Sequence, residues 1–378
     1  MEHAPGRCAN PPPGRLRYAS VRGFNARTTW NVASISGNSE RVKILFFCGV
    51  PFGLTHGGAQ IQIEQTKIGL ENVGVEVEWF RWWDDQQTGD VLQYFGRIPT
   101  WMIPAAHTKG MKVAMMELLT GQGSRSMGRL RMQKWVYRLA AGVQRVRPGL
   151  TLPADSYRYA DACMALTEWE KFLMIYVYGA APEKTYVTPN GVEDAFFESQ
   201  PAAGRSPWLV CTATITGRKR VLELAQAAIR ARTPVWVIGK PYSETDGYAR
   251  RFIELARQNP QYVRYEGPVS DRRKVAEIYR AARGFVLISA MESMSLSALE
   301  AAACHCPLLL SDLPWARSVF NETASYCPAT GSVEATAAAL RRFYDAAPDL
   351  KPPPKPLDWK EVGQQFKTIY EGMLRTSR

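Results

Sequence analysis

The sequence predicts an α/β protein built from two successive halves, each with its own parallel sheet. Its 378 residues exceed the size at which a single hydrophobic core stops growing. Short apolar runs alternate with helix-patterned segments in two series along the chain. A segment rich in Pro, Gly and Ala, Ser199 to Pro207, lies between the series and reads as a linker. We therefore expect two domains of ordinary size.

Residues 1–40 are predicted to be a disordered tail. They are rich in Pro, Gly, Arg, Ser and Asn and have neither helical nor strand periodicity. An over-extended translation start is the alternative interpretation of the same composition.

The first half begins with the apolar run VKILFFCGV after Arg41, which is typical of a buried parallel strand. After the loop PFGLTHGGAQ, apolar spacing predicts a helix from Ala59 that Gly74 closes. Further strands are expected at Val75–Trp79, Asp90–Phe95 and Met111–Met116, with a helix around Trp101. A basic helical segment, Arg129–Val146, precedes one more strand within Arg158–Leu166 and the helix TEWEKFLMIYVYG. This alternation is Rossmann-like.

The second half repeats the pattern. Four strands separated by helices are expected to start at the following residues: Leu209, Val235, Val263 and Phe285. After the helix-breaking run KPPPKP, the spacing of Trp359, Phe366 and Met373 predicts a closing amphipathic helix.

One stretch of the second half, Glu292 to Pro307, predicts a loop and a helix between two buried strands. If the helix begins near Ser295, Glu292 precedes it and Glu300 lies on its second turn. A helix start presents unpaired backbone N–H groups, and the small Ser293 and Ser295 allow a diphosphate to approach them. Two acids beside such an anion site indicate a sugar nucleotide.

The net charge of +12 and the pI near 9.4 predict attraction to anions, which include nucleotide phosphates, acidic membrane surfaces and nucleic acid. No basic run is interleaved with aromatics, so a nucleic-acid partner is not expected. No apolar run is long enough to span a bilayer, and the N-terminus lacks the layout of a signal peptide. These features favour a cytoplasmic protein, soluble or peripheral at the inner membrane surface.

The seven cysteines are odd in number and several lie in apolar runs, which indicates a reducing compartment. Cys304-His305-Cys306 has no second cluster that would complete four metal ligands, and Asp84-Asp85 is not a D-x-D pair. We expect no metal site and no cofactor.

Several motifs together resemble the retaining glycosyltransferases of family 4, which have the GT-B fold. They are GGAQ after the first strand, TEWEKFLMIYVYGAAPEKTYVTPNGVE before the linker, RKRVLEL, and two glutamates eight apart followed by ALEAAACHCPLLLSDLPW. The resemblance covers residues 41–375. It implies two Rossmann-like domains facing across a cleft, with an acceptor-side domain (residues 41–200 plus 356–378) and a domain that binds the nucleotide sugar (residues 201–355).

The resemblance also implies roles for single residues. Glu292 would be the catalytic residue that contacts the transferred sugar, and Glu300 would bind the ribose hydroxyls. Backbone N–H groups would hold phosphate oxygens at four consecutive residues, namely Ser293, Met294, Ser295 and Leu296.

Three weaker groups complete the expected donor site. Gly57 and Gly58 would face the donor, although a strand-to-helix turn needs glycine whatever it binds. Arg218 and Lys219 would bind the diphosphate, the alternative being a solvated charge cluster with Arg220. The turn that ends in Val269 would hold the nucleotide base, or be a plain turn.

This chain departs from the family pattern at five places. Thr214 stands where an arginine is usual, and Ser293, Ser295 and His305 stand where glycines are usual. No histidine ends the strand Met111–Met116, so the following segment ELLTGQG, with Glu117, Thr120 or Gln122, would line the acceptor side.

We therefore expect a metal-independent retaining enzyme that moves a hexose from a UDP- or GDP-sugar to a glycan, a lipid-linked acceptor or another hydroxyl. A non-catalytic sugar-nucleotide or glycan-binding relative and a GT-B-fold epimerase are the alternatives. The basic segment Arg125–Arg147 has two interpretations, a contact with anionic lipid and an Arg-rich solvated helix.

Overall fold

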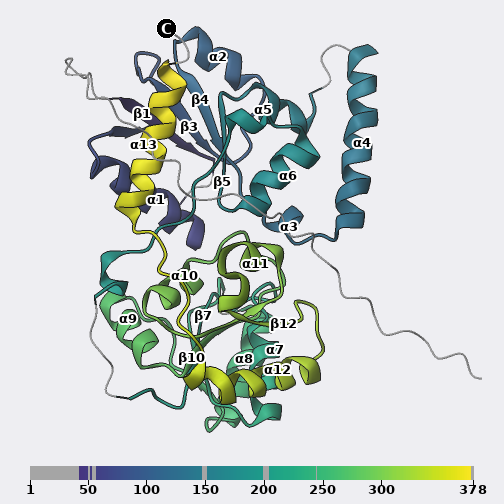
Figure 1. The fold of residues 1–378 in the computed structure, drawn as a ribbon, viewed down its shortest axis with the longest axis vertical. Helices are drawn as coiled ribbons and strands as arrows, with labels where there is room; N and C mark the ends of the chain where they lie inside the picture. The colour runs from purple at the N-terminus through teal and green to yellow at the C-terminus, as the bar shows by residue number, and fades with distance from the viewer. Residues whose placement is uncertain are drawn as a thin grey trace, which may run out of the picture. The chain divides into compact units, whose positions relative to one another are not determined.

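The computed structural model describes residues 42–49, 52, 57–146, 151–198, 204–243 and 245–375. The predicted tail, residues 1–40, lies outside this range. Residues 41–378 form one compact unit that contains two six-stranded sheets (Figure 1). Neighbouring strands in both sheets pair in parallel, with helices between consecutive strands, so the predicted α/β class is confirmed.

The first sheet has the strand order β2-β1-β3-β4-β5-β6. Its strands are β1 (Lys43–Cys48), β2 (Glu76–Trp79), β3 (Val91–Phe95), β4 (Lys112–Met116), β5 (Ala162–Ala165) and β6 (Thr185–Val187). Central strands are buried on both faces, as the continuous apolar runs predict; β5 is buried along its whole length.

The second sheet has the order β12-β11-β10-β7-β8-β9. Its strands are β7 (Leu209–Thr212), β8 (Val235–Ile238), β9 (Val263–Tyr265), β10 (Gly284–Leu287), β11 (Leu308–Ser311) and β12 (Ser325–Cys327). Three of the four predicted strand starts are the first residue of an observed strand, and the fourth, Phe285, is the second residue of β10.

Thirteen α-helices flank these sheets in the described part of the chain. Those of the first half are α1 (Gly58–Glu71), α2 (Met102–Thr108), α3 (Thr120–Gly123), α4 (Met127–Val146), α5 (Pro153–Tyr159) and α6 (Glu168–Tyr178). The others are α7 (Val221–Ala231), α8 (Gly247–Gln258), α9 (Arg272–Ala281), α10 (Leu296–Ala303), α11 (Pro314–Phe320), α12 (Val333–Ala346) and α13 (Trp359–Arg375). Short 3₁₀ turns lie at Pro182–Lys184, Asp194–Phe196, Asn321–Thr323 and Ala347–Asp349.

The strand expected within Arg158–Leu166 is confirmed, but it is shorter than that range. Arg158 belongs to α5, and the strand covers only Ala162–Ala165. The Leu152 N–H donates to Asp155 Oδ2 at 2.8 Å, and Pro153 occupies the first helical position, so the chain is capped as a helix here. β6 and β12, which have three residues each, were not predicted.

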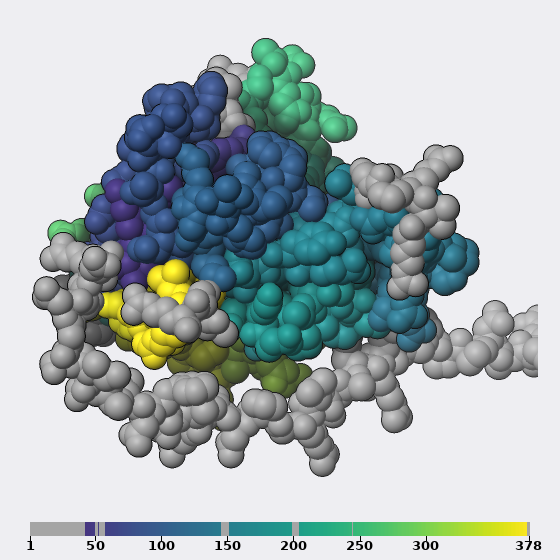
Figure 2. Space-filling view, turned by 90° about the horizontal axis from the view of Figure 1, so that it is seen from above, coloured from purple at the N-terminus to yellow at the C-terminus, as the bar shows by residue number. Residues whose placement is uncertain are grey.

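The closing helix α13 packs against the first sheet's layer, and its predicted existence is confirmed. The Tyr370 hydroxyl donates to Gln93 Oε1 on β3 at 2.9 Å, and both residues are buried. α13 crosses α1 at two glycines: a Cβ on Gly69 would lie 2.1 Å from the Trp359 carbonyl oxygen, and one on Gly363 would lie 2.2 Å from that of Gly69. Figure 2 shows the yellow C-terminal helix against the purple N-terminal segments.

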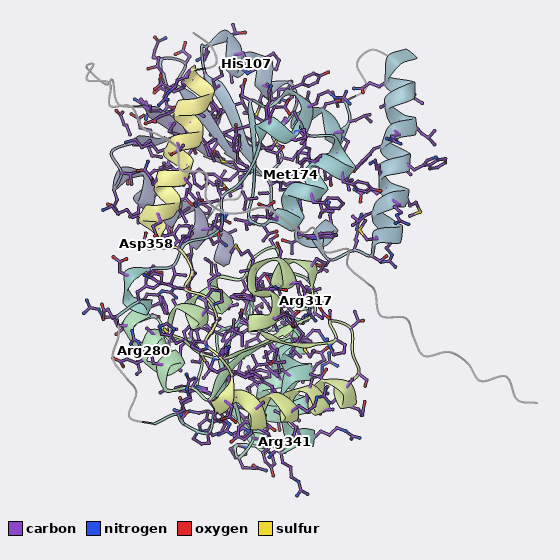
Figure 3. The ribbon with its side chains drawn as sticks, viewed as in Figure 1. His107, Met174, Arg280, Arg317, Arg341 and Asp358 are labelled. Atoms are coloured by element: carbon purple, nitrogen blue, oxygen red, sulfur yellow. The ribbon has the colours of Figure 1, made fainter. Side chains whose placement is uncertain are left out.

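The chain passes twice between the two sheets, once after β6 and once before α13. These two segments pair with each other, because the Val192 N–H donates to the Leu357 carbonyl at 2.9 Å beside a bridge between Val192 and Asp358. Asp358 is labelled at this junction in Figure 3. The division into one domain of residues 41–200 plus 356–378 and another of residues 201–355 stays a prediction.

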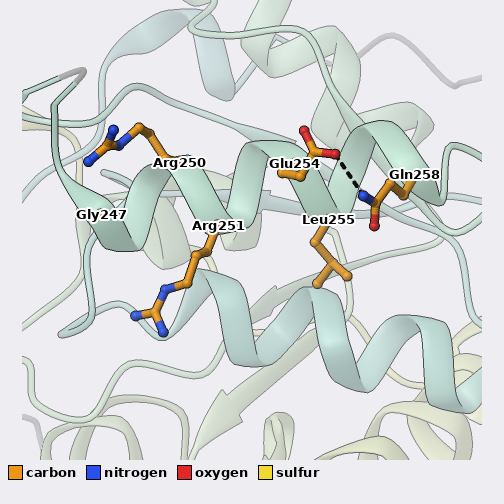
Figure 4. Close-up of a pocket in the computed structure, with 6 residues that line it drawn as sticks. All are labelled: Gly247, Arg250, Arg251, Glu254, Leu255 and Gln258. Atoms are coloured by element: carbon orange, nitrogen blue, oxygen red, sulfur yellow. Dashed lines mark hydrogen bonds between the residues drawn. The ribbon is translucent and has the colours of Figure 1, made fainter.

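None of the described helices is both long enough and apolar enough to cross a bilayer. A hollow beside α8 is lined by Gly247, Arg250, Arg251, Glu254, Leu255 and Gln258 (Figure 4). Its lining comes from one helix face, where the Gln258 side chain donates to Glu254 at 2.7 Å, so no polar groups of different elements converge there.

Candidate functional site

A cavity of about 830 Å³ lies between the two sheets and is lined by loops from both of them. Ten of the eleven residues that the sequence proposed for the site line this cavity. They are Gly57, Gly58, Arg218, Lys219, Glu292, Ser293, Met294, Ser295, Leu296 and Glu300. Val269 is absent from the lining and instead packs against the core of the second sheet, whereas its neighbour Pro268 reaches the cavity.

Parallel strands end at the same edge of a sheet, and this explains why the lining residues gather. Gly57 and Gly58 follow β1 and open α1, while Arg218 and Lys219 follow β7 and precede α7. Gly239, at the end of β8, has φ +152°, and a Cβ there would lie 1.9 Å from the Ala213 carbonyl oxygen. Glycine is therefore required where the loop after β8 meets the loop after β7.

The helix α10 begins where the sequence predicted. Ser295 is its N-cap, and the Ser295 hydroxyl accepts from the Ala298 N–H at 3.4 Å. The first-turn N–H groups of α10 border the cavity, because Ser295, Leu296 and Ser297 all line it. A helix start of this kind favours an anion at its end.

Glu292 pairs with both predicted cations. Its Oε1 lies 2.5 Å from Lys219 Nζ, and its Oε2 lies 3.3 Å from Arg218 Nη1. The Glu292 carboxylate is only 8% exposed, so these two cations offset most of the cost of burying it. Arg218 also donates to the Met291 carbonyl at 3.2 Å, and its own carbonyl accepts from the Ala290 N–H at 2.8 Å. The β7–α7 and β10–α10 loops are thereby held together.

Glu300 is buried and binds a residue that the sequence did not single out. Arg272 Nη2 lies 2.5 Å from Glu300 Oε1, and Arg272 Nε lies 2.9 Å from Glu193 Oε1. Burial raises the pKa of Glu300 above the usual range of a carboxyl, and the Arg272 guanidinium opposes this rise. Arg272 lines the cavity and opens α9 behind the N-cap Asp271, a strand-to-helix position that could have identified it.

Two hydrogen bonds join the first half to the loop before α10. The Thr120 and Ser293 hydroxyls lie 2.6 Å apart, and the Asn190 side-chain amide donates to the Met294 carbonyl at 3.2 Å. Thr120 was one of three residues expected on the acceptor side. Asn190 belongs to PNGVE and was missed as a site residue.

Glu170 fixes the segment that carries Thr120. Its carboxylate is 1% exposed and accepts the backbone N–H groups of Leu119 at 2.9 Å and Leu166 at 3.0 Å. Burial raises the pKa of Glu170, and these two amide donors oppose that rise. The loops after β4 and β5 are therefore joined through one buried side chain.

At the end of β4, the first half presents a charged cluster to the cavity. Arg97 donates twice to Glu117, with both nitrogen–oxygen distances 2.8 Å, and the Tyr157 hydroxyl donates to the same carboxylate at 2.5 Å. Burial beside this carboxylate raises the pKa of Tyr157 well above its usual range. Arg97 and Glu117 line the cavity. His107, on α2, is not part of the cavity lining (Figure 3). Its Nε2 atom lies 2.7 Å from Asp161 Oδ2.

The departures from the family pattern divide into two groups. Thr214, Ser293 and Ser295 line the cavity, and so does the cation Arg218. His305 lies outside the lining. It follows the end of α10 with φ +54°, a left-handed conformation that glycine adopts more easily. The usual glycine at this position is thus explained by the backbone.

Cys304 and Cys306 are buried in the core of the second sheet, whereas His305 is exposed, so the three side chains do not converge. No group of three or more metal-ligating side chains occurs within the described ranges.

A family model described as "Glycosyl transferases group 1" matches residues 206–346, which hold the second sheet. Among curated proteins, the D-inositol 3-phosphate glycosyltransferase of Kineococcus radiotolerans is 32% identical over 171 residues, and that of Kribbella flavida is 31% identical over 171 residues. The matched segments span 40% of this chain and only 39% and 40% of those relatives.

Solved structures resemble the chain over most of its length. A glycosyltransferase from Rickettsia africae covers 89% of this chain and 99% of its own, with a TM-score of 0.59 and 12% identity. The Anabaena protein HepE, solved with UDP and glucose, covers 89% and 99%, with a TM-score of 0.59 and 13% identity. Sucrose-phosphate synthase from Thermosynechococcus elongatus covers 89% and 100%, with a TM-score of 0.63 and 16% identity. At these identities the likeness concerns the fold, and it confirms the predicted GT-B architecture.

Proposed function

We propose that the protein is a metal-independent retaining glycosyltransferase of family 4 that moves a hexose from a UDP- or GDP-sugar to a hydroxyl acceptor. One observation carries this proposal: the buried Glu292 faces the cavity together with Lys219 and Arg218, at the start of α10. The family-model match over this region and the names of the curated relatives support it. The HepE structure with UDP and glucose supports a nucleotide sugar as donor.

The cations and the helix start would bind the donor diphosphate. The bond between the anomeric carbon and the diphosphate oxygen breaks, and both electrons leave with the diphosphate. The acceptor hydroxyl oxygen bonds to the anomeric carbon on the same face, and its proton passes to the departing diphosphate. Lys219, Arg218 and the first N–H groups of α10 stabilise the charge that develops on that leaving group.

Glu292 and Lys219 must exchange partners when the donor binds. A diphosphate that takes the Lys219 ammonium separates it from the Glu292 carboxylate, which then accepts a hydrogen bond from a sugar hydroxyl. Glu300, held by Arg272, would accept from the ribose hydroxyls. Val269 stays a proposed base contact through its backbone, beside Pro268, which lines the cavity.

The acceptor side would be formed by the first half, where Glu117, Thr120 and Arg97 line the cavity. A glycan, a lipid-linked acceptor and another hydroxyl compound all fit this proposal. Nucleic acid is not a proposed partner. Five buried thiols support a reducing, cytoplasmic location, namely Cys163, Cys211, Cys304, Cys306 and Cys327.

The proposal predicts that the substitution Glu292→Ala affects UDP binding and the rate of nucleotide release differently. Removing the carboxylate frees Lys219 for phosphate, so the affinity for UDP should stay equal or rise. Nucleotide release from UDP- or GDP-sugars, with water or an added acceptor, should fall by about a hundredfold or more. Calorimetry with UDP and a coupled assay of nucleotide release measure the two effects.

Lys219→Ala is the matched partner variant, and it should weaken UDP binding. Tight binding of a sugar nucleotide by the wild type without any turnover would favour a non-catalytic relative. Recovery of an isomerised sugar would favour an epimerase. Equal nucleotide release by the wild type and Glu292→Ala would contradict the proposed role of Glu292.

A further inference from the structure

Helix α4 packs against the first half with one of its faces. Leu130 is fully buried there, and the Tyr137 ring lies 5.6 Å from that of Tyr178 on α6. The Lys134 ammonium lies 3.6 Å from the centroid of the Tyr176 ring. The Gln144 amide donates to Asp155 Oδ2 on α5 at 2.7 Å. This inner face attaches the helix to α5 and α6.

The opposite face of α4 exposes a continuous apolar stripe. Its five members and their exposed fractions are Met132 (63%), Trp135 (61%), Val136 (49%), Leu139 (53%) and Val143 (51%). Their spacing of i, i+3, i+4, i+7 and i+11 places them within an arc of about 100° on an α-helix. Side chains of α4 project away from α6 (Figure 3). Soluble proteins rarely leave such a stripe in water, so it indicates a docking surface.

The charge around this outer face is of one sign. Residues 118–154 contain seven Lys and Arg and no Asp or Glu. Arg129, Arg131 and Arg138 are exposed on α4, on either side of the apolar stripe at 100° per residue. A partner that covers the stripe must therefore be both apolar and anionic.

We propose that the outer face of α4 binds the surface of an anionic lipid bilayer, with the helix lying in the plane of the headgroups. The stripe would enter the boundary between headgroups and acyl chains, and the flanking arginines would contact lipid phosphates. Trp135 lies within the stripe, and tryptophan favours this interface. A second copy of the chain fits less well, because a symmetric pairing of the outer faces of α4 brings the exposed Arg129, Arg131 and Arg138 close to the same three arginines of the other copy. The inference does not depend on the proposed glycosyl transfer.

Co-sedimentation of the full chain with vesicles tests the proposal. Phosphatidylcholine vesicles containing about 30 mol% phosphatidylglycerol should bind the protein at least about tenfold more strongly than pure phosphatidylcholine vesicles. Raising NaCl from about 0.1 M to about 1 M should weaken this binding, because salt screens the arginines. Equal recovery with both vesicle types would overturn the proposal.

Paired variants separate the two parts of the surface. Trp135→Ser with Leu139→Ser removes the centre of the stripe, and Arg131→Glu with Arg138→Glu reverses its flank; each pair should lower binding by about tenfold or more. The apolar control is Trp82→Ser with Trp83→Ser, which alters two other exposed tryptophans (77% and 69%). The charge control is Arg250→Glu with Arg251→Glu on α8 (Figure 4), which changes the net charge equally. Both controls should bind almost as the wild type does, and a stripe variant that binds equally well would contradict the proposal.

Insertion has its own readout. Lipids brominated in the acyl chains should quench tryptophan fluorescence of the bound wild type, and Trp135→Phe should bind while losing most of that quenching. Sedimentation velocity without lipid identifies the competing occupant. A wild-type dimer that the stripe variant converts to monomer would assign this face to a second copy and overturn the membrane proposal.

Discussion

The buried carboxylate of Glu170 illustrates how single residues shape the cavity without lining it. It holds the segment that carries Thr120, which in turn reaches Ser293 of the second half. A carboxylate suits this position because both of its oxygens accept a backbone N–H. An amide side chain has one accepting oxygen and would direct its NH₂ group at a second donor.

We therefore predict that Glu170→Gln lowers the free energy of unfolding by about 1–3 kcal/mol, the cost of leaving a buried donor without an acceptor. Urea unfolding followed by circular dichroism measures this change. Glu168→Gln is the control, because Glu168 lies on the same helix and is exposed. Equal stability of the two variants would mean that Glu170 has no such positioning role.

At the scale of elements, the two glycines at the crossing of α1 and α13 decide how the last helix docks. Backbone approaches this close leave no room for a side chain at Gly69 or Gly363. Gly372 lies on the same helix α13, and a Cβ there would meet nothing within 4 Å. One helix thus contains a glycine required by packing and another that packing does not require.

The two alanine variants should have opposite effects. Gly363→Ala forces α13 away from α1 and should destabilise the protein by about 2 kcal/mol or more, comparable to overpacking in a core. Gly372→Ala should stabilise it by about 0.5–1 kcal/mol, since alanine favours a helix over glycine. Thermal unfolding of both variants checks the prediction, and a neutral Gly363→Ala would show that the crossing can move apart.

The sequence was sufficient for elements with a strong period and for pairs of residues close along the chain. The apolar runs of β1 and β10 and the apolar stripe of α13 all appear where they were expected. Arg272 and Asn190 were missed because their partners, Glu300 and Met294, lie 28 and 104 residues away in sequence. Such pairs depend on which loops meet at a sheet edge, and a local pattern contains no record of that.

At the scale of the whole molecule, the buried cysteines make stability depend on pH above neutrality. Burial raises the pKa of four thiols from about 9 to about 12, namely Cys163, Cys211, Cys304 and Cys306. It raises that of Cys327 to about 11. In this range the unfolded chain loses thiol protons that the folded chain keeps, so the unfolded state gains stability as the pH rises.

We expect the contribution of these thiols to the free energy of unfolding to be complete below about pH 9 and to fall progressively towards pH 11. Urea unfolding at about pH 8 and pH 10.5 measures the difference. Cys211→Ala should reduce the pH dependence, because it removes one of the contributing thiols. Constant stability across this interval would contradict the raised pKa values.

The return of α13 to the first sheet also bears on how the chain folds as it is synthesised. The second sheet with its helices is fully translated by residue 346, before any of α13 exists. The core around α1 is incomplete until α13 has been synthesised, because Trp359, Phe366 and Tyr370 of α13 fill part of it. Domains nearest the N-terminus usually fold first during translation. Here the second sheet can form its complete set of contacts first, because the first sheet still lacks α13.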